Sequence, residues 1–127
     1  MSHPFDPNEG LIIVPTRLWG PSGDTVVRLA LDTGATGSVV SWDIVVFLGY
    51  DPAIVSERIQ MTTGSGVEFV PRVIIERIEG LRQERQYFPV LCHNMPPSAT
   101  VDGVLGLDFF RGRRLIIDFR IGLVTLE

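Results

Sequence analysis

The sequence contains no lysine, and its eleven positively charged residues are all arginines. Fifteen acidic residues outnumber them, so the formal net charge is −4 at pH 7. Proteins that bind nucleic acid need a basic surface that displaces counterions from phosphates. The cluster of Arg111, Arg113 and Arg114 is typical of a solvated turn instead. The charge balance therefore argues against nucleic acid as a partner.

Cysteine and long apolar runs are also scarce. Cys92 is the single cysteine, so no disulfide can form within the chain, and a reducing compartment is the simplest expectation. No run of about 18 apolar residues exists, and residues 1–10 are polar and interrupted by proline. Neither a membrane span nor a signal peptide is predicted. We therefore expect a cytoplasmic protein that does not contact a membrane.

The remaining composition is that of a folded protein. The 127 residues are 45% hydrophobic and 20% charged, with a mean hydropathy of +0.25. This length allows one hydrophobic core of ordinary size. We expect a flexible N-terminal tail at residues 1–10 and one domain over residues 11–127.

Short strands separated by turn signals dominate this domain. Segments 10–19 and 24–32 are rich in β-branched residues and flank the turn sequence GPSG, which predicts a hairpin. The glycine-containing sequence TTGSG, at residues 62–66, predicts the tip of a second hairpin. Residues 86–92 predict another strand, and the chain closes with LIIDF and LVTLE as a final hairpin.

Helix signals are few. Residues 41–49 predict one short helix, because Ser41 can cap its start and Gly49 can end it. One more helical turn is expected after Gly106. The predicted fold class is therefore all-β with one or two short helices.

An Asp-Thr-Gly triplet, Asp32 to Gly34, directly follows the apolar strand that ends at Leu31. A strand that leaves the core positions its following loop rigidly, and catalytic residues are often placed there. The triplet alone is more typical of a strand-ending turn, since Asp and Gly favour turns. A second feature favours a functional interpretation: about seventy positions later, Val104 and Leu105 form an apolar pair before Gly106.

This ordered set of motifs resembles the aspartic proteases of the retroviral, single-lobe type, including the stand-alone domains of bacteria. The resemblance extends from Leu11 to Leu126 and is carried by LALDTGAT, TTGSG, VLG and the closing strands. It implies a small closed β-barrel of the retropepsin type that forms a symmetric homodimer. In that fold the strand with the apolar-apolar-Gly element lies beside the catalytic loop.

The resemblance implies that Asp32 is catalytic. Peptide hydrolysis by carboxylates needs one ionised group to take a proton from water and one protonated group to donate to the carbonyl. Two carboxylates about 3 Å apart share a single proton. Because the chain has one Asp-Thr-Gly, the second acid is expected from another copy. The implied activity is hydrolysis of an extended, hydrophobic peptide segment without a metal or other cofactor.

The residues beside Asp32 acquire roles from the same resemblance. The Thr33 hydroxyl, which can donate and accept, is expected to form a hydrogen bond across the two-fold axis. Gly34 would let the substrate backbone approach. Ala35 stands where pepsin-like relatives carry a hydroxyl that stabilises the ionised acid. The absence of that hydroxyl here predicts an activity optimum at mildly acidic to neutral pH.

The resemblance also implies a flap and a set of subsites. A flap that closes over the substrate and excludes water is expected at the second hairpin tip: Thr63, Gly64, Ser65 and Gly66. The substrate would bind as an added strand. The residues expected at the subsites, or on the strand beside the catalytic loop, are Val39, Val104, Leu105 and Gly106.

One departure concerns the dimer contact. Retroviral relatives typically place Arg after the apolar-apolar-Gly element and pair it with an acid that follows the catalytic triplet. Here Leu107 occupies the first place, and Thr36 and Gly37 stand where the acids would be. A dimer of this chain must therefore use other contacts.

Other interpretations remain open. The barrel could serve as a peptide-binding or assembly module without turnover, since fold does not fix function. It could also be a precursor-like domain that processes only itself or one partner. Cys92 and His93 lack further ligands at metal spacing, so no zinc site is predicted. The acids expected to be structural are Asp102, Asp108 and Asp118.

Overall fold

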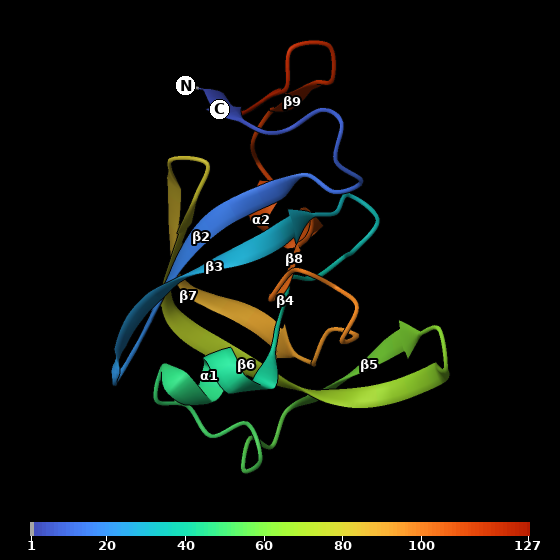
Figure 1. Ribbon diagram of the computed structural model, residues 1–127. Helices are drawn as coiled ribbons and strands as arrows, with labels where there is room; N and C mark the ends of the chain where they lie inside the picture. Colours follow the sequence, from blue (N-terminus) through green and yellow to red (C-terminus); the bar gives the residue numbers. More distant parts are fainter. Residues whose placement is uncertain (1) are drawn as a thin grey trace.

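The computed structural model describes residues 2–127 as a closed β-barrel with a projecting hairpin, a small terminal sheet and two short helices (Figure 1). Six strands form the barrel, and β6 pairs back to β2 to close it. Their order is β2 (Ile13–Gly20), β3 (Gly23–Leu31), β8 (Gly103–Leu105), β4 (Val39–Val40), β7 (Gln83–Cys92) and β6 (Gly66–Gly80). The predicted all-β barrel is confirmed.

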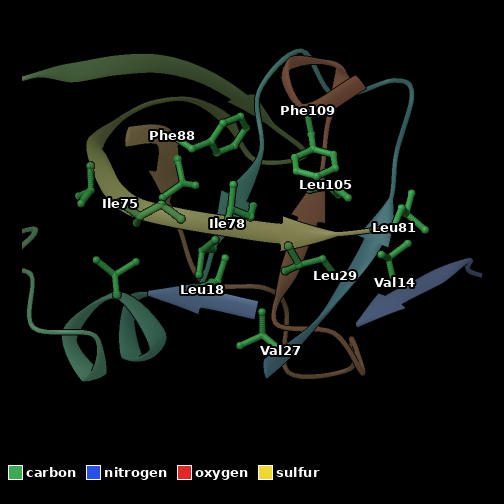
Figure 2. Close-up of a cluster of buried hydrophobic side chains, with 14 of the residues drawn as sticks. Val14, Leu18, Val27, Leu29, Ile75, Ile78, Leu81, Phe88, Leu105 and Phe109 are labelled. Carbon is green, nitrogen blue, oxygen red and sulfur yellow. The ribbon is translucent and has the colours of Figure 1, made fainter. Parts of the chain in front are cut away.

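Alternation of side chains fills the barrel interior. In β2, Val14 and Leu18 are fully buried, whereas Pro15 and Arg17 between them are exposed. This is the pattern of strands with one face on a core. Figure 2 shows the apolar side chains of several strands meeting in the interior. Phe109 lies among them, fully buried, and each such side chain contributes roughly 1.5–3 kcal/mol by burial.

The first hairpin and both helices lie where the sequence predicts them. Helix α1 (Trp42–Phe47) begins after Ser41, and the chain leaves it at Gly49, whose φ of 100° suits a residue without Cβ. Helix α2 (Leu107–Phe110) follows Gly106. The strand predicted at 86–92 is longer in the structure, because β7 starts at Gln83.

A tight turn explains the early start of β7. Gly80 pairs with Gln83, and the two residues between them, Leu81 and Arg82, have φ of 51° and 61°. Two-residue hairpins favour such turns because their twist matches that of the strands. Glycine and asparagine usually occupy them, so this Leu-Arg turn carries no sequence signal. Leu81 is only 6% exposed, and its burial in the core offsets the backbone strain.

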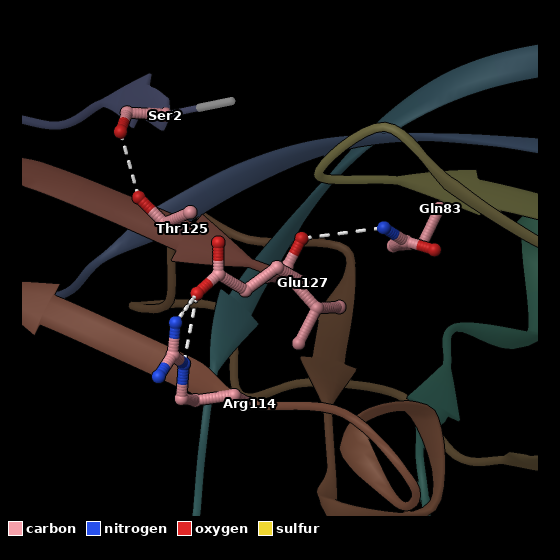
Figure 3. Close-up of polar contacts among 6 residues, drawn as sticks. Ser2, Gln83, Arg114, Thr125 and Glu127 are labelled. Atoms are coloured by element: carbon pink, nitrogen blue, oxygen red, sulfur yellow. Dashed lines mark hydrogen bonds and ion pairs between the residues drawn. The ribbon is translucent and has the colours of Figure 1, made fainter.

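The two ends of the chain form a separate three-stranded sheet. Strand β10 (Leu123–Leu126) lies between β1 (Ser2–Pro4) and β9 (Leu115–Asp118). The Ser2 hydroxyl contacts the Thr125 hydroxyl at 2.7 Å (Figure 3). The sequence predicted a tail over residues 1–10, whereas residues 2–4 form this strand. Backbone pairing with β10 orders a segment that is too short and polar to signal a strand by itself.

Side chains join this terminal sheet together and to the barrel. The guanidinium of Arg114 donates to the Glu127 carboxylate, and this hydrogen bond lowers the pKa of Glu127 (Figure 3). The Gln83 side-chain amide donates to the Leu126 carbonyl oxygen at 3.2 Å. The β6–β7 turn therefore supports the C-terminal strand.

The thiol of Cys92 is expected to be unreactive in the folded protein. It is 1% exposed, and burial raises its pKa to about 11, against a smaller lowering effect of the Arg58 charge. At about pH 8 a disulfide reagent such as dithionitrobenzoate, which needs the thiolate, should label it only after denaturation. Stoichiometric labelling of the native protein within minutes would contradict this burial.

The same shift has a consequence for stability. The pKa is higher in the folded state, so the stabilising contribution of the neutral buried thiol is fully present below about pH 9. It is lost as pH rises toward about 11, because the unfolded chain releases its proton first. Urea unfolding of Cys92→Val should lack this part of the alkaline decline.

Candidate active site

Asp32 directly follows the barrel strand β3, and three hydrogen bonds hold it there. Strands β3 and β8 run parallel, and Leu31 lies beside Leu105. The Asp32 N–H donates to the Leu105 carbonyl oxygen at 3.0 Å. The Gly34 N–H donates to Asp32 Oδ1 at 2.8 Å, and the Ala35 N–H to the Asp32 carbonyl oxygen at 3.2 Å. The carboxylate is therefore fixed by its own loop and by the neighbouring strand.

Gly106 packs directly against this loop. A Cβ at Gly106 would lie 2.8 Å from the Ala35 carbonyl oxygen and 2.9 Å from the carbonyl carbon and oxygen of Gly37. The next residue, Leu107, donates its N–H to that same Ala35 oxygen at 2.8 Å. The apolar-apolar-Gly element thus lies against the Asp32 loop, and only glycine permits so close an approach.

A hydrogen-bonded pair, the buried Ser38 and the half-buried Asp108, joins the loop to helix α2. Ser38 is fully buried, and its hydroxyl donates to Asp108 Oδ1 at 2.7 Å. The Ser38 N–H donates to Asp108 Oδ2 at 3.0 Å. Because the hydroxyl proton is committed to the carboxylate, the Ser38 oxygen accepts from the Gly106 N–H at 3.0 Å. Both carboxylate oxygens of Asp108 are therefore engaged in support of the loop.

Sequence reasoning assigned Asp108 a structural role and did not single out Ser38. The contacts agree with that structural role. Asp102 and Asp118 also accept from backbone N–H groups, those of Arg28 and Arg120 respectively. One signal for Ser38 was present, since a polar residue directly before a buried Val-Val strand needs a hydrogen-bond partner.

Asp32 opens onto a cleft of about 740 Å³. The predicted residues along its lining are Asp32, Gly34, Ala35, Val39 and Val104. Two other predicted subsite residues lie outside the lining. Leu105 is fully buried in the core, and Gly106 faces the backbone of the loop. These two residues contact the backbone of the Asp32 loop on the side away from the cleft.

Several apolar walls of the cleft were not predicted. Ile59 and Met61 come from β5 (Arg58–Thr63), Leu91 from β7, and Met95 from the loop after β7. In β5 the half-buried Ile59 and Met61 alternate with exposed polar residues, which is a signal of a half-buried strand. Nothing in the local pattern indicates which cavity such a strand faces.

The hairpin of β5 and β6 projects from the barrel (Figure 1). We call residues 58–71 the flap arm. Its tip lies at the predicted place: Thr63 pairs with Gly66, and the Thr63 hydroxyl donates to the Gly66 carbonyl oxygen at 3.2 Å. Strand β5 of this hairpin lines the cleft, but the tip residues Thr63 to Gly66 do not. Thr33, in the Asp32 loop, is exposed.

Residues 2–127 show neither a candidate metal site nor a candidate membrane-spanning helix. No group of three or more His, Cys, Asp or Glu side chains there could hold a metal ion. None of the helices in that range has the length and apolar character that crossing a membrane requires.

Known proteins are similar to this chain in sequence and in fold. Residues 22–112 match the family described as gag-polyprotein putative aspartyl protease. The fold is similar to that of a retropepsin-like aspartic protease from Rickettsia conorii, with a TM-score of 0.74 and 12% identity over 99% of this chain and 89% of that one. It is also similar to the retroviral protease-like domain of Ddi1 from Leishmania major, with a TM-score of 0.55 and 16% identity over 94% of this chain and 96% of that one. No curated protein matches the chain.

Proposed function

Because the chain belongs to the family of gag-polyprotein putative aspartyl proteases, we propose that it is an aspartic endopeptidase whose dyad is shared by two copies. One observation carries this proposal. Asp32 faces the cleft, whereas both oxygens of the other acid in the lining, Asp108, are engaged by Ser38. Each chain thus offers one acid for catalysis, and the reaction needs two.

The proposed dyad consists of Asp32 and its equivalent in a second copy. One carboxylate is ionised and takes a proton from a water molecule, whose oxygen then attacks the peptide carbonyl carbon. The other carboxyl group is protonated and donates to the carbonyl oxygen as the tetrahedral intermediate forms. Collapse of this intermediate breaks the C–N bond, and a proton passes to the leaving amine. The two acids end with one shared proton, as they began.

The surrounding residues have matching proposed roles. The exposed Thr33 is available to form a hydrogen bond across the two-fold axis. Gly34, also exposed, leaves room for the backbone of an extended peptide. Residues 63–66 would close over that peptide as a flap and exclude water. The apolar walls formed by Ile59, Met61 and Leu91 favour hydrophobic side chains beside the cleaved bond.

A mixed peptide library tests the proposal. The purified protein is incubated with the library at several pH values, with and without a statine-type inhibitor, and the products are read by mass spectrometry. We expect inhibitor-sensitive internal cleavage between hydrophobic residues, with an optimum at mildly acidic to neutral pH. Sedimentation should find the active species to be a dimer.

Each other outcome has a distinct meaning. Cleavage only near the protein's own termini would indicate a self-processing domain. Binding of library peptides without cleavage would indicate a peptide-binding module. A pH optimum near 2 to 3 would contradict the role inferred for Ala35, and an active monomer would contradict the shared dyad.

A further inference from the structure

The flap arm is buried at its base, at Val70 and Pro71, and its residues farther out are mostly exposed. Among the strands of residues 2–127, β5 pairs only with β6 and forms the edge of the sheet. At the base of the arm, one guanidinium nitrogen of Arg72 donates to both carboxylate oxygens of Glu57, at 2.8 and 3.0 Å. Farther out, Glu68 Oε2 lies 3.0 Å from His93 Nε2. This second contact joins the arm to the barrel.

His93 stands on a rigid part of the barrel rim. It directly follows β7, and its N–H donates to the Val40 carbonyl oxygen at 3.1 Å. The side-chain oxygen of the next residue, Asn94, accepts from the Trp42 N–H at 2.9 Å, at the start of α1. The His93 backbone is thereby held to β4 and to the helix. Glu68, in contrast, belongs to the projecting hairpin.

The chemistry of the contact requires a hydrogen on His93 Nε2. An ionised carboxylate can only accept, so Nε2 carries the hydrogen and donates it to Glu68. Nδ1 is buried and has no hydrogen-bond partner among residues 2–127. The bond to Glu68 is of the stronger, charge-assisted kind.

The position of this bond connects two walls of the cleft. Within the flap arm Glu68 lies opposite Met61, which lines the cleft. Met95, two residues after His93, lines it as well. The Glu68–His93 bond therefore sets the separation between the flap wall and the rim wall. We propose that His93 is a positioning residue that latches the flap arm through Glu68, an inference that rests on the proposed peptidase function for its catalytic meaning.

Hydrogen exchange of the flap arm tests the latch without requiring activity. His93→Leu removes the donor, whereas His93→Gln keeps an N–H donor of similar reach. Amides of residues 59–70 should exchange roughly fivefold faster in His93→Leu, and close to the wild-type rate in His93→Gln. Strands β2 and β3 should be unchanged in both. Glu79→Gln, an exposed change on the same strand β6, serves as the matched control and should leave the flap arm unaffected.

Equal flap exchange in His93→Leu and wild type would overturn the latch. So would loss of protection throughout the barrel, because that would show a general structural role.

Peptide kinetics give a second readout. A latch that positions the flap for substrate binding should make KM rise roughly fivefold in His93→Leu with kcat changed less than about twofold, and His93→Gln should restore KM. A fall in kcat at constant KM would contradict it. If the wild-type protein cleaves no peptide, the proposed function fails while the exchange experiment still decides the latch. The two failures are therefore distinguishable.

Discussion

Asp32→Asn is expected to abolish peptide hydrolysis and to leave the fold intact. The amide cannot take a proton from water or share one with a second acid, so kcat/KM should fall by roughly 10³-fold or more. Asparagine has nearly the same shape, and its side-chain oxygen can still accept from the Gly34 N–H, as Asp32 Oδ1 does at 2.8 Å. Circular dichroism and the urea midpoint should therefore match those of the wild type.

A matched control for this change is Asp102→Asn. Asp102 accepts from the Arg28 N–H at 2.9 Å and lies outside the cleft lining. The same chemical change there should leave kcat/KM within about twofold of the wild type. If Asp32→Asn retained a tenth of the wild-type activity or more, another group would have to carry the hydrolysis.

Mixing the two proteins tests whether the dyad is shared. When equal amounts of wild type and Asp32→Asn exchange subunits freely, about a quarter of the dimers contain two intact acids. The mixture should then show about half the activity of its wild-type portion measured alone. Strictly additive activity would mean that each chain works by itself.

Local patterns were sufficient to predict an all-β chain with short helices and the position of the Asp32 loop, whereas the closed barrel was implied by the family resemblance. Alternating apolar residues identify β2 and β3, and a turn sequence joins them. The apolar run ending at Leu31 placed Asp32 at a strand end, where the structure has it. Each of these patterns is formed by residues that are close together in the chain. The sequence of this one protein is therefore enough to show them.

Contacts between distant segments could not be predicted in this way. Ser38 and Asp108 are seventy positions apart, and neither residue by itself indicates the other. Strand β1 exists because β10 pairs with it, although residues 2–4 have no strand signal of their own. The same holds for His93 and Glu68, which are 25 positions apart and meet where the flap arm passes the end of β7. Such pairs form because the arrangement of the strands brings distant segments together. That arrangement depends on the packing of the whole core.

Gly103→Ala is expected to have the largest effect on stability. A Cβ there would lie 1.9 Å from the Val39 carbonyl oxygen, 2.9 Å from the Val39 carbonyl carbon and 3.1 Å from the Val40 Cα. These are backbone atoms of β4, which is held between β7 and β8 and cannot move aside. We expect destabilisation by about 4 kcal/mol or more, at the upper end for single substitutions.

Urea unfolding measures this effect, and Gly10→Ala is the control because a Cβ at Gly10 meets nothing within 4 Å. The control should unfold at the wild-type midpoint, whereas Gly103→Ala should be largely unfolded or strongly shifted. An unshifted midpoint would mean that β4 and β8 are not packed as closely as the structure has them. Any Gly103→Ala protein that folds should also lose activity, because displaced β8 would move the Leu105 oxygen that holds the Asp32 N–H.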